Sequence, residues 1–452
     1  MRKQRMLLCW FVSLIFCGLV AAQEPQYVPL STAEPVLAAY AGSLPPDLKV
    51  PLSAADWEKW LRQRDAGIRA RLEGGEELTL TNLLRLGVTY TKQQRITFRE
   101  LAEYGTTTFA NTLAENRARD LVRALATPSA NPGLQEMQSF LHKKGFDLKT
   151  PAGQEKVKAY LLAALARQRD DVAHEQQEAS KNPFQAFKDR GISTDSNLYP
   201  DYLIYLRLRQ MAAEHQLTPG SVHRVAIVGP GLDFVNKKFG ADFYPPQITQ
   251  PFAVIDTLVR LHLADLNSLQ VYTFDISDRV NDHLARARKN AAAGRPYPIQ
   301  LMATFPPDQP WASGYAEFWK TLGSHVGTPV KAIPVPEGAW EIRNRAISVR
   351  PDVVRRVVPV NMNVVLQMLP LAPDQRFDLI IATNVFVYYG AFEQSLARTS
   401  LAGMIKPGGF LICNERLPET APSKLTYSQR TVVTITETPP VLDYMFSYAR
   451  QK

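Results

Sequence analysis

Two closely spaced glycines behind an apolar run are the first candidates for chemistry in this chain. Residues 224–228 are rich in β-branched side chains and are followed at once by Gly229-Pro230-Gly231. A residue without a Cβ lets the main chain approach a ligand closely, so that backbone N–H groups face its polar end. A tight turn between a strand and a helix also needs glycine, so both interpretations stay open for this pair.

A carboxylate follows the next apolar run along the chain. Residues 269–274 predict a strand, and Asp275 comes directly after it, two residues before Ser277. An acid at the end of the second parallel strand lies beside the crevice where the strand order reverses, and there it can accept hydrogen bonds from both hydroxyls of a ribose. The alternative is a helix N-cap, but Ser277 or Asp278 would already fill that role. We therefore favour ribose binding by Asp275.

The C-terminal half alternates strands with helices, which predicts a parallel sheet covered on both faces. Residues 431–436 and 444–448 predict an antiparallel pair at the edge of this sheet. A segment at about 294–348 interrupts the alternation with prolines, glycines and aromatic residues, and we expect an inserted lid or substrate element. The expected strands are 224–228, 269–274, 357–360, 377–382 and 409–413, and the expected helices are 277–292 and 392–405.

The N-terminal half predicts an all-helical domain over residues 52–218. Ser53 and Asp56 form a capping box, which opens a helix with Trp57 and Trp60 on one face. We expect Gly74-Gly75 to end that helix. Residues 23–51 are rich in proline and predict an extended arm. Further helices are expected over 107–126, 154–177 and 200–215.

The first 22 residues have the order of a signal peptide. A basic start is followed by the uncharged apolar run 6–20, and Ala21-Ala22 precede Gln23 as at a cleavage site. We expect export to the periplasm or beyond the cell, with an uncleaved membrane anchor as the alternative. If it stays uncleaved, this segment is the sole membrane contact that the sequence indicates.

The composition limits the class of protein and the kinds of site that this chain can have. The 452 residues are 45% hydrophobic and 21% charged, which is typical of globular domains. A net charge of +9 is mild for this length and does not indicate a nucleic-acid partner. The seven histidines are scattered without metal-binding spacing, so no metal site is expected. Outside the leader only Cys413 remains, which excludes an internal disulfide and predicts a small buried side chain in a strand.

The order of several motifs resembles the class I S-adenosylmethionine-dependent methyltransferases over residues 222–452. These are Val228-Gly229-Pro230-Gly231, Asp275, Asn361-Met362-Asn363, the segment 377–389, and Lys406-Pro407-Gly408-Gly409. Within residues 377–389, Asn384-Val385 followed by Tyr388 is similar to the chemotaxis-receptor methyltransferases. The resemblance implies an α/β fold, a Rossmann-like class I methyltransferase sheet behind the N-terminal helical domain.

The resemblance also implies the cofactor S-adenosylmethionine and positions that would hold it. Gly229 and Gly231 would approach its methionine part, and Asp275 would bind its ribose. Asn361, or else Asn363, would lie by the adenine, and Asn384 would line the floor near the sulfonium.

Two departures from the family pattern affect the glycine motif: Ile227 stands where the family has an acid, and Asp233 stands at the usual third glycine. Tyr388 and Tyr389 are pocket candidates, with packing at a strand end as the alternative. The sequence predicts no catalytic base, because a carboxylate or thioether acceptor needs none.

Two functions remain open at this point. The first is a methyltransferase of unknown acceptor that aligns its two substrates for in-line methyl transfer. The second is an exported, non-catalytic binding protein that kept the fold. The leader favours the second, because S-adenosylmethionine is made in the cytosol, and fold alone does not decide between them.

Overall fold

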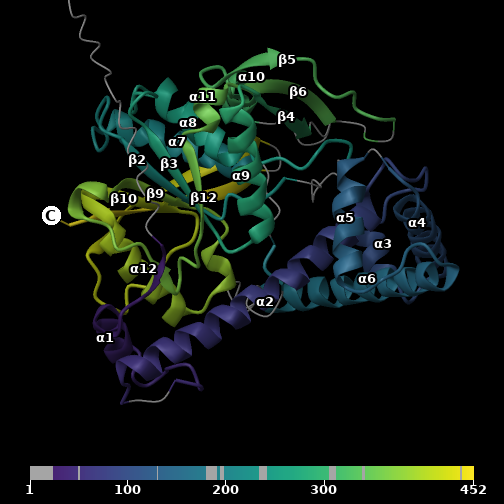
Figure 1. The fold of residues 1–452 in the computed structure, drawn as a ribbon, viewed down its shortest axis with the longest axis horizontal. Coiled ribbons are helices and arrows are strands. Elements are labelled where there is room, and N and C mark those ends of the chain that lie inside the picture. The colour runs from purple at the N-terminus through teal and green to yellow at the C-terminus, as the bar shows by residue number, and fades with distance from the viewer. Residues whose placement is uncertain are drawn as a thin grey trace, which may run out of the picture.

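A computed structural model describes residues 24–48, 51–129, 131–179, 191–193, 198–233, 242–304, 312–337, 339, 342–437 and 440–451. Its centre is a twisted seven-stranded sheet (Figure 1). The strands are β2 (Arg224–Val228), β3 (Gln270–Asp275), β7 (Val357–Asn361), β9 (Phe377–Ala382), β10 (Ile405–Cys413), β11 (Leu425–Glu437) and β12 (Pro440–Arg450).

The strand order identifies the fold. The sheet runs β11-β12-β10-β9-β2-β3-β7, with β7, β3, β2, β9 and β10 parallel. Strand β12 is antiparallel to both β10 and β11. Counted along the chain, the order is 3-2-1-4-5-7-6 with the last strand inserted antiparallel, so the predicted class I methyltransferase fold is confirmed. The order reverses between β2 and β9, where a crevice for ligands is expected.

Alternating side chains divide the sheet between two cores. Helices α7 (Tyr199–Ala213), α8 (Gln250–Arg260) and α9 (Asp278–Ala292) cover the face that buries Ile227 and Ile381. Helices α1 (Leu30–Ala39) and α12 (Ala391–Met404), with the start of α2 (Ala54–Leu86), cover the face that buries Val228 and Ala382. Because successive residues of a strand face opposite sides, one apolar run supplies both cores.

Helix α2 extends from the sheet into a separate helical bundle (Figure 1). The first half of α2 packs in the sheet core, whereas Leu80, Leu83 and Leu84 pack in the bundle core. Residues 54–72 and helix α7, which lie within the predicted helical domain 52–218, pack in the two cores of the sheet. The rest of the bundle is α3 (Phe98–Glu103), α4 (Thr108–Ala126), α5 (Pro132–Lys143) and α6 (Pro151–Ala179).

The glycine pair 74–75 does not end α2, which contradicts the sequence expectation. The helix continues through it to Leu86. Residues 191–193 cross the helix at this point, and a Cβ on Gly75 would lie 1.9 Å from the carbonyl oxygen of Ile192. The backbone N–H of Ile192 also donates to the carbonyl of Arg71 at 3.0 Å. The glycines thus give space for a crossing chain, which a local pattern cannot reveal.

The proline-rich arm 23–51 is more structured than predicted. Within it, β1 (Gln26–Tyr27) pairs antiparallel with β8 (Gln367–Met368). Helix α1 follows and packs on α12. The indole of Trp57 donates to the carbonyl of Val28 at 2.7 Å, which ties the arm to α2.

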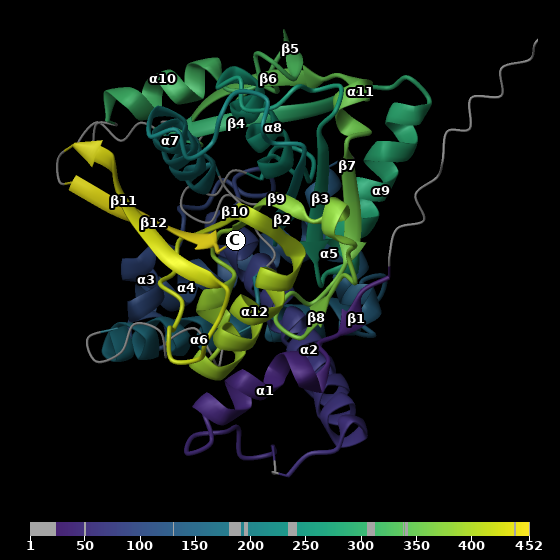
Figure 2. The ribbon, with the colours of Figure 1, turned by 90° about the vertical axis from the view of Figure 1, so that its left-hand side faces the viewer.

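The insertion 294–348 forms a small sheet of its own. Strands β4 (Tyr297–Thr304), β6 (Ile342–Val349) and β5 (Gly327–Val330) are antiparallel in that order, and α10 (Ser313–Thr321) lies in the same segment. Ile299, Leu301 and Ile347 pack in the same hydrophobic core as helices α7 and α8. The insertion is therefore a packed layer on one face of the sheet, as Figure 2 also shows.

Three short elements complete the fold: α11 (Pro351–Val354), η1 (Pro373–Gln375) and η2 (Phe386–Tyr388). In the described ranges, no helix combines the length and the apolar character needed to cross a membrane. The leader predicted over residues 1–22 lies outside those ranges.

Candidate functional site

A cavity of about 430 Å³ opens at the carboxyl ends of the parallel strands. This volume falls within the range of roughly 300–1,000 Å³ that is usual for small-molecule sites. Four of the five predicted site residues line it, and the lining continues across Ile192, Ser193 and Leu72 of α2. The insertion 294–348 was expected to be a lid or substrate element, but none of its described residues lines the cavity. Leu72 of helix α2 and residues 192–193 contribute to the cavity wall instead.

The glycine turn after β2 presents bare main chain to this cavity. Gly229 and Gly231 have φ values of +62° and +66°, in the left-handed region that glycine adopts without strain. A Cβ on Gly229 would lie 2.8 Å from Cγ2 of Val385, so a larger residue has no space there. The Gly229 N–H donates to the carbonyl of Phe274 at 2.8 Å, which holds the turn against β3.

Asp275 lies at the end of β3 and faces the glycine turn. Its carboxylate is 7% exposed and accepts hydrogen bonds from the backbone N–H of Ser277, at 2.8 Å, and of Gly231. Burial raises the pKa of Asp275 to about 7, although these hydrogen bonds and the charge of Arg69 act in the opposite direction. A carboxylate has about four acceptor positions, so capacity remains for a ligand.

Asp275 lies beside the N-terminus of α9 but is not its N-cap residue. Ser277 occupies the N-cap position of α9, but its side chain makes no capping hydrogen bond. Asp275 instead accepts from the Ser277 N–H, two residues along the chain. Ser277 thus occupies the N-cap position as expected, and Asp275 accepts from its backbone N–H while it lines the cavity.

The two asparagines after β7 have different surroundings. Asn361 is exposed and outside the cavity lining; it accepts from Nη1 of Arg69 at 2.7 Å and donates to Asp278 at 2.6 Å. Asn363 is buried and lines the cavity, with its Nδ2 donating to Asp65 at 2.8 Å. Asn363, which the sequence analysis placed second, is thus the asparagine at the cavity wall.

Two side chains of helix α2, Asp65 and Arg69, bind the helix to the ends of β3 and β7. Asp65 accepts from Tyr27 at 3.1 Å and from Nε of Arg69 at 3.1 Å, besides Asn363. Arg69 also donates to the carbonyl of Ile276 at 3.0 Å. This pair was not among the predicted site residues; its signal in the sequence is an acid and a base four residues apart on the helix that carries Trp57 and Trp60.

Asn384 lines the cavity at the end of β9. Its φ of +58° is unusual for a residue with a Cβ and is tolerated best by asparagine and aspartate. Its N–H donates to Oδ1 of Asn414 at 2.7 Å, and Nδ2 of Asn414 donates back to Oδ1 of Asn384 at 2.7 Å. This reciprocal pair fixes the ends of β9 and β10 at the rim of the cavity.

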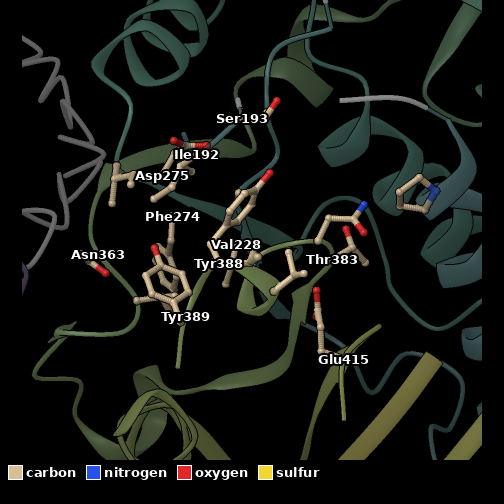
Figure 3. Close-up of a pocket in the computed structure, with 18 of the residues that line it drawn as sticks. Ile192, Ser193, Val228, Phe274, Asp275, Asn363, Thr383, Tyr388, Tyr389 and Glu415 are labelled. Carbon is tan, nitrogen blue, oxygen red and sulfur yellow. The ribbon is translucent and has the colours of Figure 1, made fainter. Parts of the chain in front are cut away.

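Tyr388 and Tyr389 also line the cavity, and both are buried. Burial raises the pKa of the Tyr389 phenol above its ordinary value. In Figure 3, Asp275 and Asn363 lie on one side of Tyr388. Thr383 and Glu415 lie on its other side, as the strand order requires.

Glu415 is a cavity residue that the sequence analysis did not identify. It follows β10 by two positions, is 7% exposed, and burial raises its pKa to about 8. The sequence did contain a signal for this residue, because Glu415 follows the predicted strand 409–413. In a parallel sheet the end of that strand lies next to the end of β9.

Asp233, at the position of the third glycine in the methyltransferase pattern, makes its own set of hydrogen bonds. Its carboxylate accepts from the Tyr244 hydroxyl at 2.5 Å and from Nε2 of Gln247 at 2.9 Å. Backbone hydrogen bonds also pair Asp233 with Gln247. Asp233 therefore lies in a bridge, and the next helix of the described residues, α8, begins at Gln250.

Comparisons with known proteins give matches among solved structures alone. No protein-family model and no curated protein matches the chain. Magnesium protoporphyrin IX methyltransferase from Synechocystis, solved with bound S-adenosylmethionine, is 11% identical; the match covers 62% of this chain and 98% of that one, with a TM-score of 0.27.

Two further solved methyltransferases match at a comparable level. The N-methyltransferase NodS from Bradyrhizobium japonicum, in complex with S-adenosylhomocysteine, is 11% identical over 62% of this chain and 98% of that one, with a TM-score of 0.27. TrmN from Thermus thermophilus is 12% identical over 55% and 48%, with a TM-score of 0.27. Similarity at this level carries no argument about activity, and the fold assignment stands on the strand order. The likeness of residues 377–389 to chemotaxis-receptor methyltransferases stays a prediction.

Proposed function

We propose that this protein is an S-adenosylmethionine-dependent methyltransferase whose acceptor is unknown. The observation that carries the proposal is the buried carboxylate of Asp275 beside the side-chain-free turn of Gly229 and Gly231. These groups lie at the reversal point of a class I sheet, where ligands of such sheets bind. The cavity is open and polar enough to take a small molecule there.

The residues of the cavity fit the parts of this cofactor. Asp275 would accept from the ribose hydroxyls, and the Gly229-Gly231 turn would approach the amino-acid part. Asn363 would lie at the adenine end and Asn384 near the sulfonium. When bound, the cofactor supplies an electrophilic methyl group for in-line displacement.

The contribution of the chain itself is alignment and exclusion of water. Leu72, Ile192 and Tyr389 add apolar surface to the cavity wall, which lowers the local dielectric. The Asp65–Arg69 pair and the Asn384–Asn414 pair hold four strand ends in place, so the wall is organised before a ligand arrives. Such preorganisation is where an enzyme of this type gains its rate.

Calorimetric titration of the full chain with S-adenosylhomocysteine tests the proposal. We expect binding to the wild type and a loss of at least tenfold in affinity for Asp275→Ala, because one carboxylate holds both ribose hydroxyls. Asp374→Ala, an exposed acid in the short helix η1, is the matched control and should bind as the wild type does. Absence of heat with the wild type contradicts the proposal.

A non-catalytic binding protein with this fold is the second candidate, and the signal-peptide pattern of residues 1–22 favours it. In that case the domain lies outside the cytosol, whereas an uncleaved anchor leaves the first function possible. Protease accessibility in intact cells tests the location. Methyl transfer from labelled S-adenosylmethionine to a cell extract separates the enzyme from the binding protein.

A further inference from the structure

Two buried oxygen atoms in the cavity wall have no hydrogen-bond partner within the part of the chain that the structure describes. They are Oε2 of Glu415 and Oε1 of Gln250, on side chains that are 7% and 2% exposed. Gln250 begins helix α8, and its Nε2 donates to the hydroxyl of Thr383 at 3.0 Å. In Figure 3 the carboxyl group of Glu415 points toward Thr383. The two oxygens therefore belong to one end of the cavity, at β9 and β10.

We propose that this end of the cavity binds the amino group of the methyl acceptor, with Glu415 and Gln250 accepting its N–H hydrogen bonds. The inference rests on the proposed function and names its substrate class, an amine. A buried polar atom without a partner keeps the full cost of its lost hydration, so atoms of this kind are expected to find their partner in a ligand.

The chemistry of the two atoms selects the kind of ligand. An amide oxygen accepts hydrogen bonds and does not donate them, so Gln250 requires a donor. An ammonium group offers three donors and no acceptor, whereas an acceptor carboxylate offers none. A primary amine in its charged form can thus reach both oxygens at once, and a hydroxyl, with its single donor, can reach one.

The electrostatic surroundings of Glu415 also favour a cation. Burial is the main cause that raises its pKa, and the charge of Asp443 on β12 acts in the same direction. The thiol of Cys413 also interacts with Glu415, and the carboxyl of Asp201 on α7 interacts with Gln250; burial raises the pKa of both groups. Among the described residues, no ion pair compensates Glu415, so a bound ammonium would supply the missing positive charge.

Glu415 also has the position to accept a proton from the acceptor. An ammonium nitrogen has no free electron pair, so it must lose a proton before it reacts. The proton passes to the Glu415 carboxylate, and the freed nitrogen pair forms the new C–N bond. At the same time the carbon–sulfur bond of the sulfonium breaks, and its electron pair stays on sulfur as a thioether. The product is a methylammonium ion with the charge that the sulfonium carried.

Infrared difference spectroscopy between the wild type and Glu415→Gln tests the inference without any turnover. The carbonyl stretch of the protonated carboxyl group should titrate near pH 8 in the free protein. Propylammonium should move this midpoint to lower pH, because the cation stabilises the carboxylate. Propanol, which has the same length without the charge, should leave it unchanged. An unmoved midpoint with propylammonium overturns the inference.

Binding measurements on variants complete the test. Propylammonium affinity should fall about tenfold in Glu415→Gln and also in Gln250→Met, which keeps length and removes the acceptor. Glu419→Gln, an exposed acid paired with Arg416 at 2.6 Å, should bind as the wild type does. S-adenosylhomocysteine titration is run in parallel: if it binds normally while the amine does not, this inference fails and the proposed function stands, whereas no cofactor binding is a failure of the proposed function.

Discussion

At the scale of single residues, Asp275 sets the pH range in which the cavity can bind a diol. Its pKa in the free protein is about 7, because burial disfavours the charged form. Ribose hydroxyls donate to the carboxylate, so binding requires the deprotonated state. Affinity for S-adenosylhomocysteine is therefore expected to be full above about pH 8 and to fall roughly tenfold per pH unit below 7. Titration calorimetry from pH 5.5 to 8.5 measures this, with Asp275→Asn expected to bind weakly and without this pH dependence.

Arg69 modulates the same titration from helix α2. Its charge lowers the pKa of Asp275, although less strongly than burial raises it. Replacing it, as in Arg69→Gln, is expected to raise the pKa of Asp275 further. The fall in cofactor affinity then begins at a higher pH than in the wild type, which the same calorimetric series detects. A midpoint that stays unchanged would show that the Arg69 charge does not reach the carboxylate.

At the scale of elements, the crossing of α2 and residues 191–193 closes one wall of the cavity. Gly75→Ala puts a methyl group where the carbonyl of Ile192 lies, so these residues must shift. We expect a loss of about 1–3 kcal/mol in the free energy of unfolding and a several-fold weaker affinity for S-adenosylhomocysteine. Chemical denaturation and calorimetry measure the two effects.

Gly67 provides a control on the same helix. A Cβ at Gly67 meets nothing within 4 Å. Gly67→Ala should therefore stabilise the protein by about 0.5–1 kcal/mol, through helix propensity alone, and leave ligand binding unchanged. If Gly75→Ala gave the same gain, the crossing would not be as close as the geometry indicates.

At the scale of the whole molecule, α2 connects the core of the helical bundle to that of the sheet. One continuous helix supplies Trp57 and Ile68 to the sheet side and Leu83 to the bundle. We therefore expect one cooperative thermal transition, which a ligand at the cavity shifts upward as a whole. At a ligand concentration of 100 times Kd the shift corresponds to about 2.7 kcal/mol. Calorimetric scanning with S-adenosylhomocysteine tests this, and two transitions of which one moves would contradict it.

The sequence by itself determined the sheet and the main features of the cavity. Short β-branched runs such as 224–228 and 377–382 became β2 and β9, because a buried parallel strand needs apolar side chains on both faces. Gly229 and Gly231 follow the run 224–228, Asp275 follows the run 269–274, and the ends of parallel strands meet at one edge. This is why Gly229, Gly231 and Asp275 converge there as predicted.

The tertiary structure decided what depends on contacts between distant segments. The path of α2 through Gly75 follows from a chain that crosses it more than a hundred residues later, and no local signal marks that crossing. The choice of Asn363 over Asn361 depends on Asp65. Whether Oε2 of Glu415 and Oε1 of Gln250 find a partner among the described residues depends on what surrounds each atom. Local periodicity fixes which faces are apolar, but the partner of each polar atom is set when the layers pack.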